Sequence, residues 1–309
     1  MTKMTIAGAL QSVLDEIVAA LAQTTDRGVV ADYIPELSRA NLAMFGIAVA
    51  LPGGEVLAAG DADTPFSIQS ISKVFTLAMA LGRLGEGLWR RVGREPSGLA
   101  FNSILQLEQE NGRPRNPFVN AGAIVVTDAI LAHNEPRELL AELLRFVREA
   151  AGDDDIHINR DVARSEATTG HRNLALAHML KAQGNLHNTP DRVLGTYFHQ
   201  CAIEMSCVQV AQAGRFLIGA RETALIAGDN VRRINALMMT CGHYDGSGEF
   251  AYRVGLPAKS GVGGGILAIA PRRASIGVWS SGLNAHGNSK IGTLAAEMLA
   301  DRMGWSVFN

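Results

Sequence analysis

The two ends of the chain differ from its middle in how hydrophobic and polar residues are spaced. Near the start, residues 45–60 form two apolar runs on either side of Pro52-Gly53-Gly54, a pattern that predicts a β-hairpin. Near the end, three short apolar stretches at 250–257, 263–271 and 272–282 are again bounded by glycine or proline, which predicts three more strands. The sequence therefore predicts five strands, two from the first part of the chain and three from the last.

The middle of the chain has the periodicity of helices. Residues 70–85 are apolar nearly all round, which predicts a helix that is buried on every side. Residues 189–217 form another helical segment, with Thr189 as its cap and Pro190 in its first turn, a combination typical of helix starts. The middle of the chain is therefore predicted to consist of helices joined by polar loops.

These elements predict an α/β (α+β) fold in which helices flank one antiparallel sheet. A closing helix follows the last strand, with Ser289 as its N-cap. If the five strands pair, the first and last parts of the chain must meet in space, with the helical middle as a lobe beside the sheet. We expect one catalytic domain over 1–309, with a sheet lobe at about 1–69 and 245–309 and a helical lobe at about 70–244. A cleft between the lobes is the expected place for a small-molecule site.

Composition and charge narrow the class of protein. The chain has 309 residues, of which 47% are hydrophobic and 19% charged, values typical of a well-packed globular protein. Its net charge of -2 and pI near 6.5 argue against nucleic-acid binding, which needs a basic face. The first two dozen residues have helical apolar spacing interrupted by Asp15 and Glu16, unlike a signal peptide. No stretch has the roughly 18 apolar residues of a membrane span, so we expect a cytoplasmic protein with no nucleic-acid or membrane partner.

The cysteines and histidines give no indication of a metal or redox site. Cys201, Cys207 and Cys241 form no C-x-x-C pair and are expected to be buried free thiols in a reducing compartment. The eight histidines include no H-E-x-x-H pattern, and His171 and His178 have no carboxylate partner in register. We therefore expect no metal and no cofactor.

Ser70 and Lys73 are the first candidates for catalysis. They lie three residues apart at the start of the predicted buried helix, so their side chains share a face. A serine hydroxyl needs a base to become a nucleophile, and a lysine can be that base when desolvation lowers its pKa. An S-x-x-K match alone is weak, because a capping serine and a solvated lysine produce the same pattern.

A second pattern, Lys259-Ser260-Gly261, precedes the apolar run that is predicted as a late strand. S-x-x-K on a central helix with K-T/S-G on a late strand is the pattern of serine β-lactamases and penicillin-binding proteins. That strand can offer a backbone N–H to a developing oxyanion, with the N–H of Ser70 as the second donor. The glycines at 261–265 let main chain approach a substrate closely, or mark a tightly packed strand; both interpretations are open.

The S-D-N motif of that superfamily is absent, so another group must move protons. Tyr244 is a candidate, because a phenol beside Lys73 could relay protons. The alternative is a half-buried aromatic side chain near a turn.

Longer motifs give the chain a specific resemblance. They extend across most of the sequence: ADYIPEL at 31–37, PFSIQSISK at 65–73, EPSGLAFN at 95–102, NPFVNAGAIVV at 116–126, SE at 165–166, RN at 172–173, CGHYD at 241–245 and GLPAKSGVGGGI at 255–266. With these motifs the chain resembles the serine-dependent glutaminases of bacteria and animal mitochondria. The resemblance implies a β-lactamase-like fold, no cofactor, a homodimer or homotetramer, and hydrolysis of a linear amide, L-glutamine, to L-glutamate and ammonia.

The resemblance also assigns roles to residues. It implies that Ser70 is the nucleophile, that Lys73 and Tyr244 transfer protons, and that the N–H groups of Ser70 and Val262 form the oxyanion hole. Lys259, from the K-S-G pattern, completes the predicted catalytic set. The substrate-binding set that it implies is Tyr33, Ser70, Asn120, Glu166, Asn173, Tyr197, Tyr244 and Val262. This set suits glutamine, since Glu166 can pair with the α-ammonium and the amides can hold the α-carboxylate. Whether Lys73 or Tyr244 first deprotonates Ser70 is left open.

Two other functions compete with this prediction. A β-lactam-recognising serine hydrolase on the same fold would have an S-x-N-like middle motif and an export signal, and neither is visible. A non-catalytic glutamine sensor would keep the pocket but would not need Ser70, Lys73, Tyr244 and Lys259 together.

Overall fold

A five-stranded antiparallel sheet lies at the centre of the computed structural model, which describes residues 6–132, 134–219 and 228–309. The strand order is β2-β1-β8-β7-β6, so the predicted sheet from both ends of the chain is confirmed. The strands are β1 (Gly46–Ala50), β2 (Val56–Gly60), β6 (Ala258–Ser260), β7 (Gly265–Ala270) and β8 (Ala274–Trp279).

The first and last parts of the chain meet where β1 pairs with β8. This antiparallel ladder runs from Gly46 opposite Trp279 to Ala50 opposite Ser275. The predicted hairpin around Pro52-Gly53-Gly54 is also confirmed, because β1 pairs directly with β2. Residues of β1, β7 and β8 are buried at every position, which is expected when helices cover both faces of a sheet.

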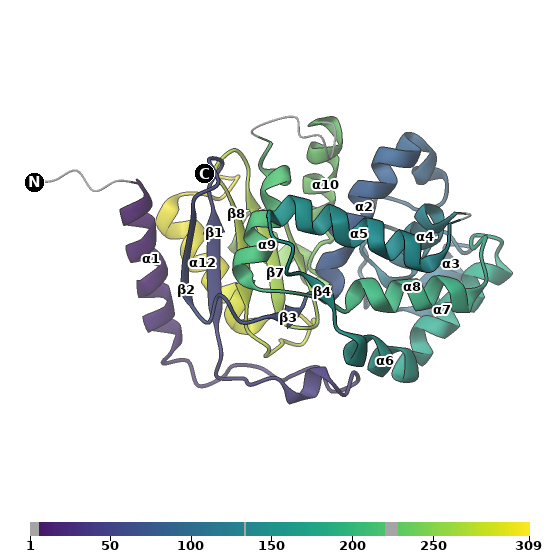
Figure 1. Cartoon of the computed structure of the whole chain (residues 1–309), viewed down its shortest axis with the longest axis horizontal. Helices are drawn as coiled ribbons and strands as arrows, with labels where there is room; N and C mark the ends of the chain where they lie inside the picture. The colour runs from purple at the N-terminus through teal and green to yellow at the C-terminus, as the bar shows by residue number, and fades with distance from the viewer. Residues whose placement is uncertain (1–5, 133, 220–227) are drawn as a thin grey trace, which may run out of the picture.

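Helices surround the sheet on both faces and form most of the middle of the chain (Figure 1). Among the described residues α1 and α12 pack on one face, where they contact β2, β7 and β8, and α9 packs on the other against β1 and β8. The helices are α1 (Ile6–Leu21), α2 (Ser72–Leu84), α3 (Ile104–Gln109), α4 (Asn120–Leu131), α5 (Pro136–Ala151), α6 (Arg160–Thr169), α7 (His171–Ala182), α8 (Pro190–Cys201), α9 (Cys207–Ala213), α10 (Gly228–Cys241), α11 (Ser247–Arg253) and α12 (Lys290–Met303). Ser289 caps α12 as predicted, since its side chain accepts from Gly292 N–H.

The prediction of a strand at 250–257 is wrong. The first half of that segment belongs to helix α11, and the strand that pairs with β7 begins only at Ala258. Phe250 and Val254 are both buried while Tyr252 between them is 89% exposed. Apolar residues four apart share one face of a helix, and this spacing was mistaken for the alternation of a strand. As a consequence, Lys259 lies within a strand instead of before one.

The segment 189–217 is not one helix. Thr189 and Pro190 do begin α8, as predicted, but the helix ends at Cys201. A short strand, β5 (Ile203–Met205), follows and pairs with β3 (Phe66–Ser67) and β4 (His157–Ile158) in a small sheet that was not predicted. Helix α9 then starts at Cys207, and the side chain of its N-cap, Ser206, forms a capping box with Gln209.

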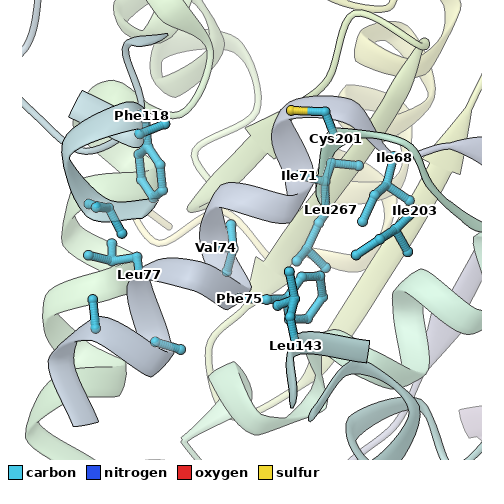
Figure 2. Close-up of a cluster of buried hydrophobic side chains, with 14 of the residues drawn as sticks. Ile68, Ile71, Val74, Phe75, Leu77, Phe118, Leu143, Cys201, Ile203 and Leu267 are labelled. Atoms are coloured by element: carbon cyan, nitrogen blue, oxygen red, sulfur yellow. The ribbon is translucent and has the colours of Figure 1, made fainter. Parts of the chain in front are cut away.

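The predicted buried helix is confirmed, with one change at its start. Helix α2 begins at Ser72, and Ser70 lies in a preceding 3₁₀ turn, η2 (Gln69–Ile71). Figure 2 shows apolar side chains of η2 and α2 pointing into a cluster with residues from several other elements. The labelled members include Ile71, Val74, Phe75 and Leu77 from this segment, with Leu143 from α5, Ile203 from β5 and Leu267 from β7. Packing from several elements fixes the position of the Ser70–Lys73 turn.

Three further observations concern the described part of the chain. Cys201, Cys207 and Cys241 are free and buried. No group of three or more histidine, cysteine, aspartate or glutamate side chains in the described residues could hold a metal ion. None of the described helices has both the length and the hydrophobicity needed to cross a membrane.

Candidate active site

Ser70 lies on the short 3₁₀ turn between β3 and α2, at the wall of a pocket. The residue before it, Gln69, has a φ of 48°, a left-handed conformation that is uncommon for a residue other than glycine. Ser70 itself is buried except for its pocket side, with 7% of its surface exposed. The backbone therefore bends sharply to present this hydroxyl.

The turn between β6 and β7 lies directly against the backbone that carries Ser70. A Cβ atom added to Gly261 would be 2.5 Å from the carbonyl oxygen of Ile68 and 3.2 Å from the backbone nitrogen of Ser70. One added to Gly263 would be 2.3 Å from the carbonyl oxygen of Ser67. These contacts leave no room for a side chain, which explains glycine at both positions.

Val262 lies between those two glycines and lines the same pocket as Ser70. Its backbone N–H has no hydrogen-bond acceptor in the part of the chain that the structure describes. An unused N–H beside a serine hydroxyl is the arrangement that an oxyanion hole requires. Because Val262 follows the end of β6, this donor comes from a turn and not from the strand that was predicted.

Lys73 is buried one helical turn below Ser70. Its Nζ donates hydrogen bonds to the backbone oxygen of Phe118 at 3.0 Å and to Oδ1 of Asn120 at 2.8 Å. Burial lowers the pKa of Lys73 to about 8, although the nearby Glu166 raises it. The predicted desolvation of this lysine is therefore present in the structure. No hydrogen bond joins Lys73 to Ser70 among the described residues.

Tyr244 interacts with Ser70 through a side-chain hydrogen bond. It lies at the start of the turn η5 (Tyr244–Gly246) with a φ of 59°, a conformation that costs about 1–3 kcal/mol and is often found at functional sites. Burial raises the pKa of Tyr244, and hydrogen bonds with Ser70 and Ser260 lower it by less. The phenol therefore keeps its proton at neutral pH.

Lys259 lies behind Tyr244 and is completely buried. Its Nζ donates to the backbone oxygens of Gly242 at 3.0 Å and Ser260 at 2.5 Å. The same nitrogen lies 4.3 Å from the centre of the Tyr244 ring, within range of a cation–π contact. Burial, with the charge of Lys73, holds the pKa of Lys259 well below its usual value.

Three polar residues lie at the other end of the pocket. Asn120, at the start of α4, donates from Nδ2 to Oδ1 of Asn173 on α7 at 2.9 Å. Glu166 on α6 is buried, and its Oε2 has no hydrogen-bond partner among the described residues. Burial raises the pKa of Glu166 to about 8, against the lowering effects of Lys73 and of a hydrogen bond with Gln69. A buried carboxyl group with a free oxygen can receive a cationic ligand.

One pocket, with about 520 Å³ of empty space including its mouth, collects most of the predicted substrate-binding residues. Tyr33 is 51% exposed, whereas Tyr197 is buried. Lys73, Tyr244 and Lys259 lie behind the wall and do not line the pocket. The predicted residues that do line it are Tyr33, Ser70, Asn120, Glu166, Asn173, Tyr197 and Val262.

Several lining residues were not predicted individually. Gln69 hydrogen-bonds to Glu166 and donates to Ser67 Oγ at 3.0 Å. Phe101 lies against Tyr244 with ring centres 4.4 Å apart, and Arg172 donates to the backbone oxygen of Asn102 at 2.9 Å. All of them lie within the motifs at 65–73, 95–102 and 172–173. Membership of these motifs was therefore the only feature of the sequence that could have identified them.

Comparison with known proteins identifies relatives over nearly the whole chain. The family model described as glutaminase matches residues 28–308. A protein named glutaminase from Mesorhizobium japonicum is 59% identical over 304 residues, which cover 97% of this chain and 96% of that protein.

Two solved structures are also similar. The one named "Probable glutaminase ybaS" has a TM-score of 0.93 at 36% identity and covers 99% of this chain and 100% of its own. The structure of Mglu in its glutamate form has a TM-score of 0.91 at 35% identity and covers 97% of this chain and 70% of its own. These similarities confirm the predicted β-lactamase-like fold.

Proposed function

Because the chain belongs to the glutaminase family and hydrolyses L-glutamine to L-glutamate and ammonia, we propose that it does so through an acyl-enzyme on Ser70. One observation carries this proposal: Ser70 lines the pocket between a buried lysine and the backbone N–H of Val262, which has no acceptor among the described residues. A nucleophile, a base and an oxyanion donor at one point are the requirements of acyl transfer.

In the first step Lys73 takes the proton of Ser70. A neutral lysine amine has two N–H groups and one lone pair, and the oxygens of Phe118 and Asn120 accept from both N–H groups. The lone pair is then free for the serine proton, one helical turn away. With a pKa of about 8, a useful fraction of Lys73 is neutral near pH 7–8. Tyr244 cannot compete as the first base, because its pKa is raised and its oxygen is protonated.

The attack forms a bond from Ser70 Oγ to the side-chain carbonyl carbon of glutamine. The carbonyl oxygen becomes an oxyanion, which accepts from the backbone N–H groups of Ser70 and Val262. When the carbon–nitrogen bond breaks, Tyr244 donates its proton to the leaving nitrogen and is reprotonated from Lys73, so that ammonia departs. Water then attacks the ester with Lys73 again taking a proton, and glutamate leaves with Ser70 restored.

Lys259 takes no part in these proton transfers in this proposal. Its Nζ is occupied by two backbone oxygens and faces the ring of Tyr244, not its hydroxyl. We assign it to holding Tyr244 and the end of β6 in place, which makes it a positioning residue.

The polar end of the pocket binds the amino-acid end of glutamine. Oε2 of Glu166, which has no hydrogen-bond partner among the described residues, pairs with the α-ammonium, and the charge of the ammonium favours ionisation of the carboxyl group on binding. The amides of Asn120 and Asn173 and the hydroxyls of Tyr33 and Tyr197 hold the α-carboxylate. The structure of the relative Mglu in its glutamate form supports a pocket that accepts the product.

Assembly and location complete the proposal. Following the resemblance, the chain forms a homodimer or homotetramer and works in the cytoplasm as one catalytic domain with a sheet lobe and a helical lobe. Sedimentation of the purified protein tests the assembly, and a single monomer peak at micromolar concentration would contradict it.

The test of the chemistry is to mix purified protein with L-glutamine and follow ammonia and glutamate, beside Ser70→Ala. Product from the wild type alone supports the acyl-enzyme. L-asparagine and a chromogenic cephalosporin are run in parallel. Binding of glutamine without ammonia would identify a sensor, and turnover of the cephalosporin alone would identify a β-lactam-recognising enzyme.

A further inference from the structure

Tyr244 needs outside support to keep its conformation. Its φ of 59° lies in the left-handed region, which a residue with a Cβ atom leaves unless the surroundings hold it. Its ring contacts both Phe101 and Lys259, but ring contacts alone do not fix the two peptide groups that flank Tyr244. Those peptide groups are held by hydrogen bonds from two side chains, Ser247 and Asn288.

Ser247 holds the turn from within. Its Oγ donates to the backbone oxygen of Tyr244 at 2.7 Å and accepts from the backbone N–H of His243 at 3.0 Å. Ser247 and the two backbone groups that it binds all lie within residues 243–247. These hydrogen bonds therefore close the turn but do not connect it to the rest of the site.

Asn288 makes that connection. From the loop before α12, its Nδ2 donates to the backbone oxygen of His243 at 3.1 Å, and its Oδ1 accepts from Ser260 Oγ at 2.6 Å. The peptide before Tyr244 is thereby linked to β6, the strand that carries Lys259 and leads to Val262. Asn288 is itself buried.

The loop that carries Asn288 is closed on itself. The backbone N–H of Asn288 donates to Oδ1 of Asn284 at 3.1 Å, and the N–H of Asn284 donates back to the oxygen of Asn288 at 2.8 Å. A Cβ on Gly287 would lie 3.9 Å from both Tyr244 and Val262, so this loop also packs over them. The side-chain amide of Asn288 is thus held in place between the turn of Tyr244, the proposed proton donor, and the strand that leads to Val262, the proposed oxyanion donor.

We propose that Asn288 is a positioning residue for catalysis, which holds Tyr244 in its left-handed conformation so that the phenol reaches Ser70. This inference rests on the proposed role of Tyr244 in proton transfer. Asn288 touches neither the pocket nor Ser70, so its loss should affect the chemical step and not the binding of glutamine.

The experiment compares Asn288→Ala, Tyr244→Phe and the double variant by kcat and KM for glutamine. Asn288→Ala is expected to lower kcat on the order of 10²-fold, as small displacements of catalytic groups do, with KM changed by less than about threefold. If Asn288 acts through the phenol, the double variant is no slower than Tyr244→Phe alone. Thermal unfolding of each variant shows that the compared proteins are folded.

Asn185→Ala is the matched control. Like Asn288, Asn185 does not line the pocket and links separate segments through its side-chain amide, which donates to the backbone oxygens of Arg91 and Gly112. It is expected to lose comparable stability and to keep kcat. If Asn288→Ala does not fold, Ser247→Ala removes the other clamp on the same peptide groups and is expected to give the same pattern.

Two results would overturn the inference, and they differ. If Tyr244→Phe lowers kcat and Asn288→Ala does not, or if their effects multiply in the double variant, Asn288 does not act through Tyr244. If Tyr244→Phe leaves kcat unchanged, the proposed role of Tyr244 itself fails.

Discussion

Asn120 accepts a hydrogen bond from Lys73 Nζ at 2.8 Å. Its other amide atom donates to Asn173 at 2.9 Å, so one side chain joins the proposed base to the residues that bind the amino-acid end of glutamine. Substrate binding and deprotonation of Ser70 are therefore coupled through the side chain of Asn120. A ligand carboxylate that competes for the Asn120 amide acts directly on the surroundings of Lys73.

This contact predicts the effect of Asn120→Asp. A carboxylate 2.8 Å from Nζ favours the ammonium form, so the pKa of Lys73 should rise from about 8 by about one to three units. The rise of kcat with pH should move to correspondingly higher pH. Asn173 contacts Asn120 and has no hydrogen bond with Lys73 among the described residues. Asn173→Asp should therefore raise KM, with a smaller displacement of the pH profile of kcat. Identical displacements in both variants would contradict the assignment of Lys73 as the base.

The wild-type enzyme should gain activity as the pH rises through about 8. Burial lowers the pKa of Lys73 to about 8, and the base is the neutral form above that value. Burial also raises the pKa of Glu166 to about 8, and the carboxylate that pairs with the α-ammonium is again the form above it. Both ionisations act in the same direction, so kcat/KM should fall as the pH is lowered from 8 to 6.

The variant Glu166→Gln distinguishes the effect of Glu166 ionisation from that of Lys73 ionisation. The variant should raise KM on the order of 10²-fold or more, because a buried ammonium loses its charge partner. Removing the carboxylate also removes its support of the Lys73 ammonium, so the kcat profile should move to lower pH. A kcat midpoint that does not change would mean that Glu166 and Lys73 do not interact.

Much of the fold follows from periodicity, and the exceptions have identifiable causes. Several elements have an apolar pattern that fits only one type of secondary structure. They are the β1–β2 hairpin, strands β7 and β8, and helices α2 and α12. The error at 250–257 arose because Phe250, Tyr252 and Val254 fit a two-residue and a four-residue repeat equally well. The strands of the small sheet contain two or three residues each, too few for any repeat to be visible.

The site was predictable in residue identity but not in geometry. Family motifs identified Ser70, Asn120 and Glu166, which line one pocket. The left-handed conformations of Gln69 and Tyr244 could not be predicted from the residue types, because neither residue is glycine or asparagine. They depend on contacts from distant segments, and such contacts exist only once the chain has folded.

Gly261→Ala should damage catalysis through the backbone. The added Cβ would lie 2.5 Å from the oxygen of Ile68, so the β6–β7 turn must move away from Ser70 and carry the Val262 N–H with it. Loss of one oxyanion donor lowers kcat by about 10²–10³-fold. Gly248→Ala is the control, since its Cβ would meet nothing within 4 Å. Steady-state kinetics on both variants, with KM for glutamine, tests the assignment; an unchanged kcat in Gly261→Ala would refute it.

Asp128 should contribute stability and not chemistry. Its carboxylate is buried on α4 and accepts from the backbone N–H groups of His187 at 3.0 Å and Asn188 at 2.8 Å, and from Arg91 at 2.5 Å. Burial raises the pKa of Asp128, but these hydrogen bonds outweigh it and hold the pKa below the usual value. A depressed pKa means that the ionised form stabilises the fold above about pH 4, and that this stability is lost as the pH falls through the folded-state value.

Asp128→Asn keeps the shape but leaves Arg91 without its charge partner. Breaking a buried pair of this kind costs about 3–5 kcal/mol, so urea unfolding at pH 7 should show a loss of that order, while kcat of the folded enzyme at low temperature stays near the wild-type value. The difference between wild type and variant should shrink as the pH is lowered from 7 towards 3, because the wild type then loses the same charge. Asp161→Asn, which removes an exposed ion pair with Arg164, should change stability by less than about 1 kcal/mol. A loss in Asp128→Asn that is constant across this pH range would mean that its hydrogen-bond geometry, and not its charge, stabilises the loop at 185–188.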